Sequence, residues 1–262
     1  SLLSYHSSKV VIPPLILLLI VFFWKDLLKI KKHLLIAVLV LSFILLVMIL
    51  DKSLLGVARI QQTSLGRNRI TDTVLFKKTN NELLGRMEVA FQQYLWHFDI
   101  KYLFFTGSSN SKFSIQSVGQ FYKSDALFLS LGFIGAIWGI LSKKDLRKKL
   151  LILLSWALLS PIPSSLVAEA PHAARALFMM GSWVLISAYG FYLMVVMLKS
   201  KIIRATVMVL GLLTISWLFI IYLTDFYNVY SKEHGIDWQY GMKQIVEQAK
   251  NDKYSAVYVT DI

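Results

Sequence analysis

The sequence predicts a mainly α-helical protein that crosses a membrane several times. Of its 262 residues, 56% are hydrophobic and only 16% are charged, against roughly 25% charged in soluble domains. The mean hydropathy is +0.59. A net charge of +13 would suggest nucleic-acid binding in a soluble protein, but in a membrane protein it indicates basic loops beside anionic lipid. We therefore expect membrane lipids, and no nucleic acid, as partners.

Six apolar stretches are the predicted transmembrane helices, because a span needs about 20 apolar residues. The first and third are short and would borrow flanking residues. The fourth contains Pro161 and Pro163, so its outer end should be broken or re-entrant. The six stretches cover residues 10–24, 34–50, 126–141, 150–167, 177–198 and 206–224.

Lys and Arg in the short connections predict the orientation. Residues 25–33, 142–149 and 199–205 together carry 12 of the 28 cations, and six alternating spans place all three connections on one side. By the positive-inside rule this is the cytoplasmic side. The N-terminus, the loop 51–125, the turn 160–176 and the tail from Asp225 should then face outward. We expect a multi-pass protein of the cell membrane.

The outer loop 51–125 contains a predicted amphipathic helix over residues 75–98. Apolar residues recur there at spacings of three and four, and Asn80 or Asn81 suits its N-cap. A helix of this kind fits the outer membrane surface. Residues 106–110 predict a turn.

The tail is predicted to begin a soluble α/β domain. Residues 238–250 have an amphipathic pattern with Tyr240, Ile245, Val246 and Ala249 facing inward, and residues 255–260 have a strand pattern. The domain organisation expected is a membrane region over 1–224 and the start of an outer domain over 225–262. Because the chain begins at Ser1 and stops in this unfinished domain, we expect an internal piece of a longer protein.

Motifs of soluble enzymes are absent from the sequence. There is no Walker loop, G-x-G-x-x-G, H-E-x-x-H or G-x-S-x-G. The spacing of the five histidines indicates no metal site, and the lack of cysteine excludes disulfides and a thiol nucleophile.

The most informative stretch is Pro-His-Ala-Ala-Arg at residues 171–175. His172 and Arg175 share a face if a helix has begun there, and such a site suits an anion. The alternative is that Arg175 reaches lipid headgroups while His172 caps the turn. His6 and Lys9 lie at the outer edge of the first span, where interfacial anchoring is the alternative.

Two further candidates lie in the outer segments. His97 and Asp99 lie at the end of the predicted outer helix, and the alternative to a functional site there is a local His–carboxylate contact that fixes a turn. Glu169 lies in the proline-rich turn and is the acid placed best for a site; its alternative is a solvated loop charge.

Five short stretches, in the same order along the chain, resemble bacterial C-type (GT-C) glycosyltransferases of the protein mannosyltransferase and aminoarabinose transferase branch. YLWHF and YLFFTG at residues 94–107 are similar to the family pattern NYLSHFSPDFLFFxGD. The other four stretches are YHSSK at 5–9, GQFY at 119–122, IPSSL at 162–166 followed by PHAAR, and WQYG at 238–241. They resemble YHSARVFxP, GQLY, IPASLTxxxPHALR and WxYGYKE.

The resemblance implies an inverting transferase that takes a sugar from a polyprenyl-phosphate-linked donor on the outer face of the membrane. His172, Arg175, Lys9 and His6 would hold the lipid phosphate. The acceptor is a protein, lipid or glycan that the sequence does not identify. No cofactor is indicated, and a divalent metal, known in the wider superfamily, has no ligand set here.

The chain departs from the family pattern at two places. Asp99, Ile100 and Lys101 replace Ser-Pro-Asp, and Lys112 with Phe113 replaces Arg-His while Lys112 keeps the positive charge. The family's catalytic aspartate lies in the first outer loop, upstream of this piece. We therefore expect the piece to lack the base and to be inactive alone.

Other classes of membrane protein predict different sequence features. A transporter or channel calls for ionisable residues inside spans and paired interrupted helices, but the predicted span interiors lack charge. An O-antigen ligase-like polymerase would also use outer loops and a lipid pyrophosphate. A plain membrane anchor predicts neither an ordered outer helix nor the P-H-x-x-R turn.

Overall fold

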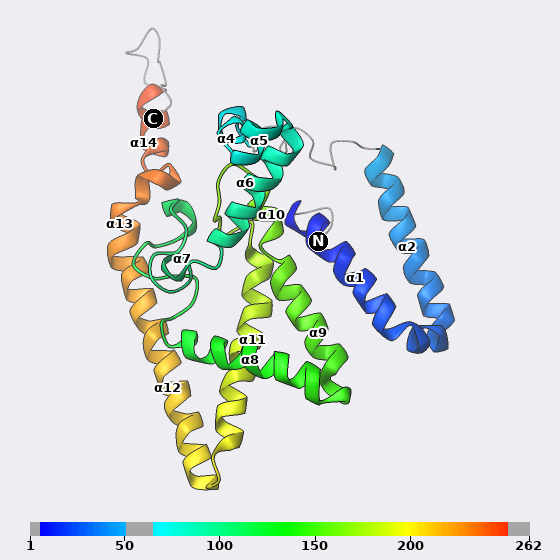
Figure 1. Cartoon of the computed structure of the whole chain (residues 1–262). Coiled ribbons are helices and arrows are strands. Elements are labelled where there is room, and N and C mark those ends of the chain that lie inside the picture. Colours follow the sequence, from blue (N-terminus) through cyan, green and yellow to red (C-terminus); the bar gives the residue numbers. More distant parts are fainter. Residues whose placement is uncertain (1–5, 51–64, 251–262) are drawn as a thin grey trace.

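The computed structural model describes residues 6–50 and 65–250, which are mainly helical and contain no strand. Figure 1 shows long helices, one of which lies across the others, with most of the short helices toward one end. The long helices are α1 (His6–Leu27), α2 (Lys31–Leu50), α8 (Asp125–Ser142), α9 (Lys144–Leu159), α11 (Leu177–Met197) and α12 (Lys201–Asp225). The short α-helices are α4 (Arg67–Thr71), α5 (Val74–Thr79), α6 (Glu82–Trp96), α7 (Ile100–Phe104), α10 (Ile162–Ser165), α13 (Ser231–Glu233) and α14 (Met242–Ala249).

Four segments of the described chain are long and apolar enough to cross a membrane, judged by length and composition: Ser7–Ile44, Asp125–Ser142, Leu177–Met197 and Lys201–Glu233. Helices therefore lie where spans were predicted over 126–141, 177–198 and 206–224. The segment Ser7–Ile44 contains α1, the 3₁₀ turn η1 (Leu28–Ile30) and most of α2. Helix α9 has 16 residues and begins at Lys144, so charged residues occupy its first turns.

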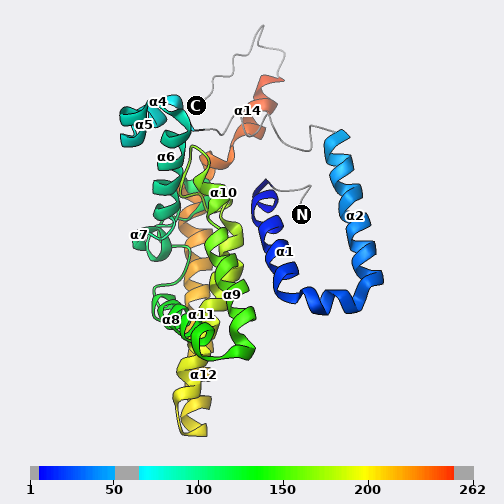
Figure 2. The ribbon, with the colours of Figure 1, turned by 45° about the vertical axis from the view of Figure 1, so that its right-hand side comes forward.

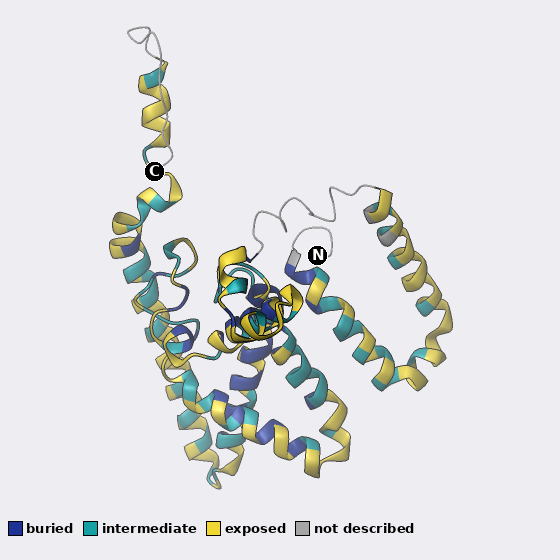
Figure 3. Ribbon diagram, turned by 45° about the horizontal axis from the view of Figure 1, so that its top comes forward, coloured by how far each residue is buried: buried dark blue, intermediate teal, exposed yellow. Residues whose placement is uncertain are grey.

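The surfaces of these helices are apolar but exposed. No residue of α12 is buried, and Figure 3 shows α2 and α12 mostly in the colour of exposed residues. Leu39 and Phe43 of α2 and Leu212 of α12 are among the exposed side chains. Large apolar surface facing outward is unfavourable in water and favourable in lipid. The fold therefore suits a membrane protein.

The basic connections all lie at one end of the helices. In Figures 1 and 2 the η1 turn, the α8–α9 corner and the α11–α12 turn lie toward the bottom, opposite α4, α5, α6 and α14. This arrangement is the one that the charge pattern predicts for connections that share a side.

Helices α8 and α11 cross closely because glycines meet at the crossing. A Cβ atom on Gly132 of α8 would overlap the backbone oxygen of Ile186, and one on Gly190 of α11 would overlap the backbone oxygen of Phe128. Trp183 of α11 lies in the core beside the crossing and donates Nε1–H to the Ala157 oxygen of α9 (3.4 Å). Small residues thus let two backbones approach and leave room for aromatic packing.

The outer helix predicted over 75–98 is two helices. Helix α5 ends at Asn80, whose φ of 50° is left-handed, and α6 begins after Asn81. The Asn81 side chain accepts the backbone N–H groups of Leu83 and Leu84, so Asn81 is the N-cap. The prediction of one continuous helix is wrong. The apolar periodicity continues across Asn80 and Asn81, so it does not reveal the break that these two residues introduce.

The tail helix was also predicted too long. Residues Gly235–Trp238 form a 3₁₀ turn, and Gln239 and Gly241 have positive φ, so α14 begins only at Met242. Tyr240, Ile245 and Val246 are exposed, and Ala249 is half-buried. The expected inward face is therefore wrong. The predicted strand over 255–260 lies outside the described residues, and no α/β domain is present within them.

Candidate functional site

The proline-rich turn after α9 folds back on itself through a short helix, α10. Helix α9 ends at Leu159, two residues before Pro161, and α10 forms a single turn. Proline lacks an N–H and clashes with a continuing helix, so the predicted break at this end is confirmed. The Ser164 hydroxyl oxygen then accepts the backbone N–H of His172 (3.0 Å), which closes the turn over α10.

His172 is buried, with 4% of its surface exposed. Its Nδ1 accepts the backbone N–H of Arg175 (3.3 Å), so the neutral ring carries its proton on Nε2. That nitrogen lies 3.7 Å from Oε2 of Glu169. Burial lowers the pKa of His172, the Arg175 charge lowers it further, and Glu169 partly opposes both. The ring is therefore a neutral donor directed toward a carboxylate.

Arg175 lies behind His172. Its backbone oxygen accepts the hydroxyl proton of Ser7 in the first turn of α1 (2.7 Å), and its Nη1 is buried without a hydrogen-bond partner among the described residues. A buried cationic N–H without an acceptor is costly, and an anion would satisfy it. The backbone N–H of Arg175 thus contacts the His172 ring, but both residues precede α11, which begins at Leu177, so the helical face on which the two side chains were expected to meet is not formed.

The beginning of α1 reaches the same place. Ser7 and Ser8 are buried, and Lys9 follows them directly in the same helix. His6 is the first residue of α1, and its side chain lies outside what the structure describes. The Ser7 hydroxyl joins the beginning of α1 to the Arg175 turn, while the grouping of His6 and Lys9 with His172 and Arg175 stays a prediction.

A polar cavity of about 370 Å³ opens beside His172 and Glu169. Its other walls come from the turn 108–110 and from Arg69 of α4. The Arg69 Nη1 donates to the Ala168 oxygen (2.6 Å), and the Ser108 hydroxyl donates to the Pro171 oxygen (3.3 Å). Arg175 does not line this cavity. Elements far apart in sequence thus place a guanidinium, an imidazole and a carboxylate around one polar space.

His97 lies within electrostatic range of His172 but is not paired with Asp99. Its ring is fully buried, Nδ1 contacts the Gln93 oxygen (2.9 Å), and Nε2 has no hydrogen-bond partner among the described residues. Burial lowers the pKa of His97 to about 4. Asp99 is exposed and caps α7 by accepting the backbone N–H of Lys101 (2.9 Å). The expected His–carboxylate contact is therefore wrong, because the N-cap uses the carboxylate.

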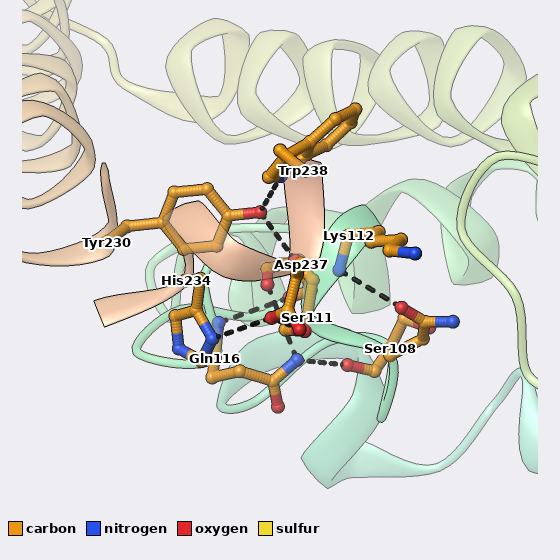
Figure 4. A network of polar contacts seen from close by, with 10 residues as sticks. Ser108, Ser111, Lys112, Gln116, Tyr230, His234, Asp237 and Trp238 are labelled. Atoms are coloured by element: carbon orange, nitrogen blue, oxygen red, sulfur yellow. Dashed lines mark hydrogen bonds and ion pairs between the residues drawn. The ribbon is translucent and has the colours of Figure 1, made fainter. Parts of the chain in front are cut away.

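Lys112 does not line the cavity beside His172. Its charge acts on Asp237, whose pKa is lowered mainly by the hydrogen bond from Ser111 and then by His234. Figure 4 shows this network, in which Tyr230 OH donates to the Ser111 oxygen (2.6 Å) and Trp238 Nε1 donates to Tyr230 OH (2.8 Å). The network fastens the tail to the loop.

The same loop touches the site through Phe113, whose ring centroid lies 4.2 Å from that of His172. Lys112 and Phe113 are neighbours in sequence but serve two different contacts. The predicted group of His97, Asp99, Lys112 and Glu169 is therefore not one site: only Glu169 lines the polar cavity.

Three residues important to this region were not predicted. Arg69 follows a segment without a motif, and nothing in its sequence context marks it. Ser108 lies in a turn that was expected but had no role assigned. Gln93 is fully buried in α6, and with its amide nitrogen facing α10 it donates to the Val167 and Ser165 oxygens (2.7 and 3.0 Å). The sequence carries one sign of this residue's role, because Gln93 is a polar side chain on the inner face of an amphipathic helix.

The described residues contain no group of three or more His, Asp or Glu side chains that could hold a metal ion. Comparisons with models of protein families, with curated proteins and with solved structures found no significant match to this chain.

Proposed function

We propose that the chain is the central and C-terminal membrane part of a GT-C glycosyltransferase that uses a polyprenyl-phosphate-linked sugar. The observation that carries the proposal is the convergence of Arg69, Glu169 and His172 on one polar cavity, with the buried Nη1 of Arg175, which has no hydrogen-bond partner among the described residues, close to His172. The ordered resemblance in sequence supports the same class. The proposal includes six spans, with α1, α2 and α9 completing the set and the basic connections facing the cytoplasm.

The electrostatics favour an anionic leaving group. Arg69 lines the cavity, while Arg175 adds positive charge next to His172. Positive groups fixed in place before the reaction stabilise charge that develops on a departing lipid phosphate. His172 adds an Nε2–H donor that stays neutral, because burial lowers its pKa. A single exposed lysine would stabilise the leaving phosphate much less, because the solvent screens its charge.

The transfer itself is an inverting displacement. The acceptor nucleophile attacks the anomeric carbon, the bond from that carbon to the phosphate oxygen breaks, and the lipid phosphate leaves with the electron pair. A carboxylate takes the acceptor proton, and we expect this base to come from the chain upstream. Glu169 lies 3.7 Å from His172, so its role in the proposal is to orient the imidazole donor.

The test uses the full-length protein around this piece. Membranes containing it are assayed for transfer from polyprenyl-phosphate sugars, with Arg175→Ala and Arg69→Ala beside the wild type. We expect each variant to lose on the order of 10²-fold in rate, as when one oxyanion donor is removed. Arg86→Ala is the matched control, because Arg86 is an exposed arginine of α6 that pairs only with Glu82 among the described contacts.

Thermal unfolding of each variant separates loss of function from loss of fold. If both Arg175→Ala and Arg69→Ala transfer sugar at the wild-type rate, the cavity takes no part in the reaction. The absence of transfer from any donor by a well-folded full-length protein would favour a transporter or a ligase-like polymerase.

A further inference from the structure

A second cavity, of about 400 Å³, lies on another side of the molecule and shares no lining residue with the polar one. It opens between α7, the first turns of α8 and α11. Its floor is aromatic: the Trp183 ring lies 5.6 Å from that of Phe98 and 5.2 Å from that of Phe133. The lining also includes Leu103, Phe104, Phe105, Ala126 and Leu129.

Lys123 is the only charged residue among those that line this cavity. Its Nζ lies 4.8 Å from the ring centroid of Phe105, a cation–π contact. Both residues are exposed, so the ammonium group stays available at the rim. Lys123 precedes α8, a helix long enough to cross a membrane, by two residues. The cation is therefore held where a spanning helix begins.

The chemistry of the lining restricts what can enter. Ser130 is the only hydroxyl in the lining, and it already donates to the Ala126 oxygen (2.8 Å). A peptide or a sugar would leave its polar groups without partners against aromatic walls, which is costly. An alkyl chain has no polar groups, so it would lose no hydrogen bonds on entering the cavity. Leu127 and Ile134 of α8 are exposed beside the cavity, so an alkyl chain would continue along a lipid-facing helix.

We propose that this cavity holds an acyl chain of an anionic phospholipid, whose headgroup phosphate lies at Lys123. An apolar cavity with one cation at its mouth is complementary to an alkyl tail joined to a negative headgroup. The acyl chain of a zwitterionic lipid would fit the same apolar lining. Its headgroup carries no net charge, so Lys123 would attract it less strongly. The inference is independent of sugar transfer, because the two cavities have separate linings.

The test is native mass spectrometry of the whole chain, purified with phosphatidylglycerol or with phosphatidylcholine. We expect the wild type to retain phosphatidylglycerol in preference. Lys123→Gln should weaken phosphatidylglycerol retention about fivefold and leave phosphatidylcholine unchanged. Ser130→Trp fills the cavity and should reduce retention of both lipids, with Ser130→Leu as a smaller replacement if tryptophan unfolds the chain.

Lys78→Gln is the matched control, because Lys78 is an exposed lysine of α5 that does not line the cavity. Equal phosphatidylglycerol retention in wild type and Lys123→Gln would overturn the headgroup contact, and unchanged retention in both folded Ser130 variants would overturn the acyl site. If these variants weaken polyprenyl phosphate binding but not phosphatidylglycerol binding, the occupant is the donor's tail and the proposal is wrong.

Discussion

The Ser111 hydroxyl donates to Oδ2 of Asp237 across 2.5 Å, although the two residues are 126 positions apart. Oδ2 also lies 3.1 Å from Nδ1 of His234. This carboxylate joins the tail to the loop that carries Phe113, and Phe113 lies against His172. The position of the tail is thus connected to the candidate site through one loop.

Asp237→Ala should release the tail from this loop. Removing the carboxylate deletes the acceptor of Ser111 and the partner of His234. Amide hydrogen exchange should become several-fold faster in residues 230–238 and 108–117, while α11 keeps its protection. Glu247→Ala is the control, since Glu247 is an exposed tail residue paired with Lys243 (3.9 Å). Equal exchange in the two variants would contradict a role for Asp237 in docking.

Stability should fall at mildly acidic pH because of His97. Burial holds the pKa of His97 at about 4, below its ordinary value of 6.5, so the unfolded chain binds this proton first as pH falls. The contribution is complete above about pH 6.5 and decreases toward pH 4, by about 3 kcal/mol. The lowered pKa of His172 acts in the same direction.

The measurement for His97 is the thermal unfolding midpoint in detergent between about pH 7.5 and 4.5. His97→Gln should flatten the decline, leaving the smaller part due to His172. His33→Gln, at an exposed histidine of α2, should keep the wild-type profile. A profile for His97→Gln as steep as that of the wild type would mean that another group causes the decline.

Gly190→Ala should destabilise the crossing of α8 and α11. The added Cβ would meet the Phe128 oxygen and the Gly132 nitrogen, and backbone atoms cannot move aside as a flexible side chain can. We expect a loss of about 1–3 kcal/mol, measured as a lower unfolding midpoint. Gly66→Ala is the control, since a Cβ there meets nothing within 4 Å. Equal midpoints for the two variants would show that the helices do not cross this closely.

The sidedness can be measured directly, because the chain has no cysteine of its own. Ser109→Cys and Ser142→Cys are matched single replacements at exposed serines. A membrane-impermeant maleimide added to intact cells should label Cys at 109 in the outer loop. It should label Cys at 142, beside a basic connection, only after the cells are opened. The reverse pattern would invert the orientation.

Local features of this protein follow from its sequence. Apolar runs of sufficient length locate α8, α11 and α12, because hydropathy and helix length depend only on neighbouring residues. Pro161 and Pro163 locate the end of α9 for a similarly local reason, the missing N–H.

Other features required the tertiary structure. The polar cavity depends on Arg69 reaching Ala168, 99 positions away, and nothing in a helical period indicates that contact. Asp99 was assigned to His97 by proximity in sequence, yet the carboxylate caps α7 while His97 is buried against α6. The tail contact of Asp237 with Ser111 is equally remote in sequence.

Hydropathy therefore locates the long apolar helices, and the prolines locate the break after α9, because those properties add up from adjacent side chains. The break between α5 and α6 and the set of polar residues that share a cavity emerge only in the folded chain. The shared cavity depends on how packed helices bring distant loops together, and the packing is determined by contacts such as that of Gly132 with Ile186, which no single segment specifies.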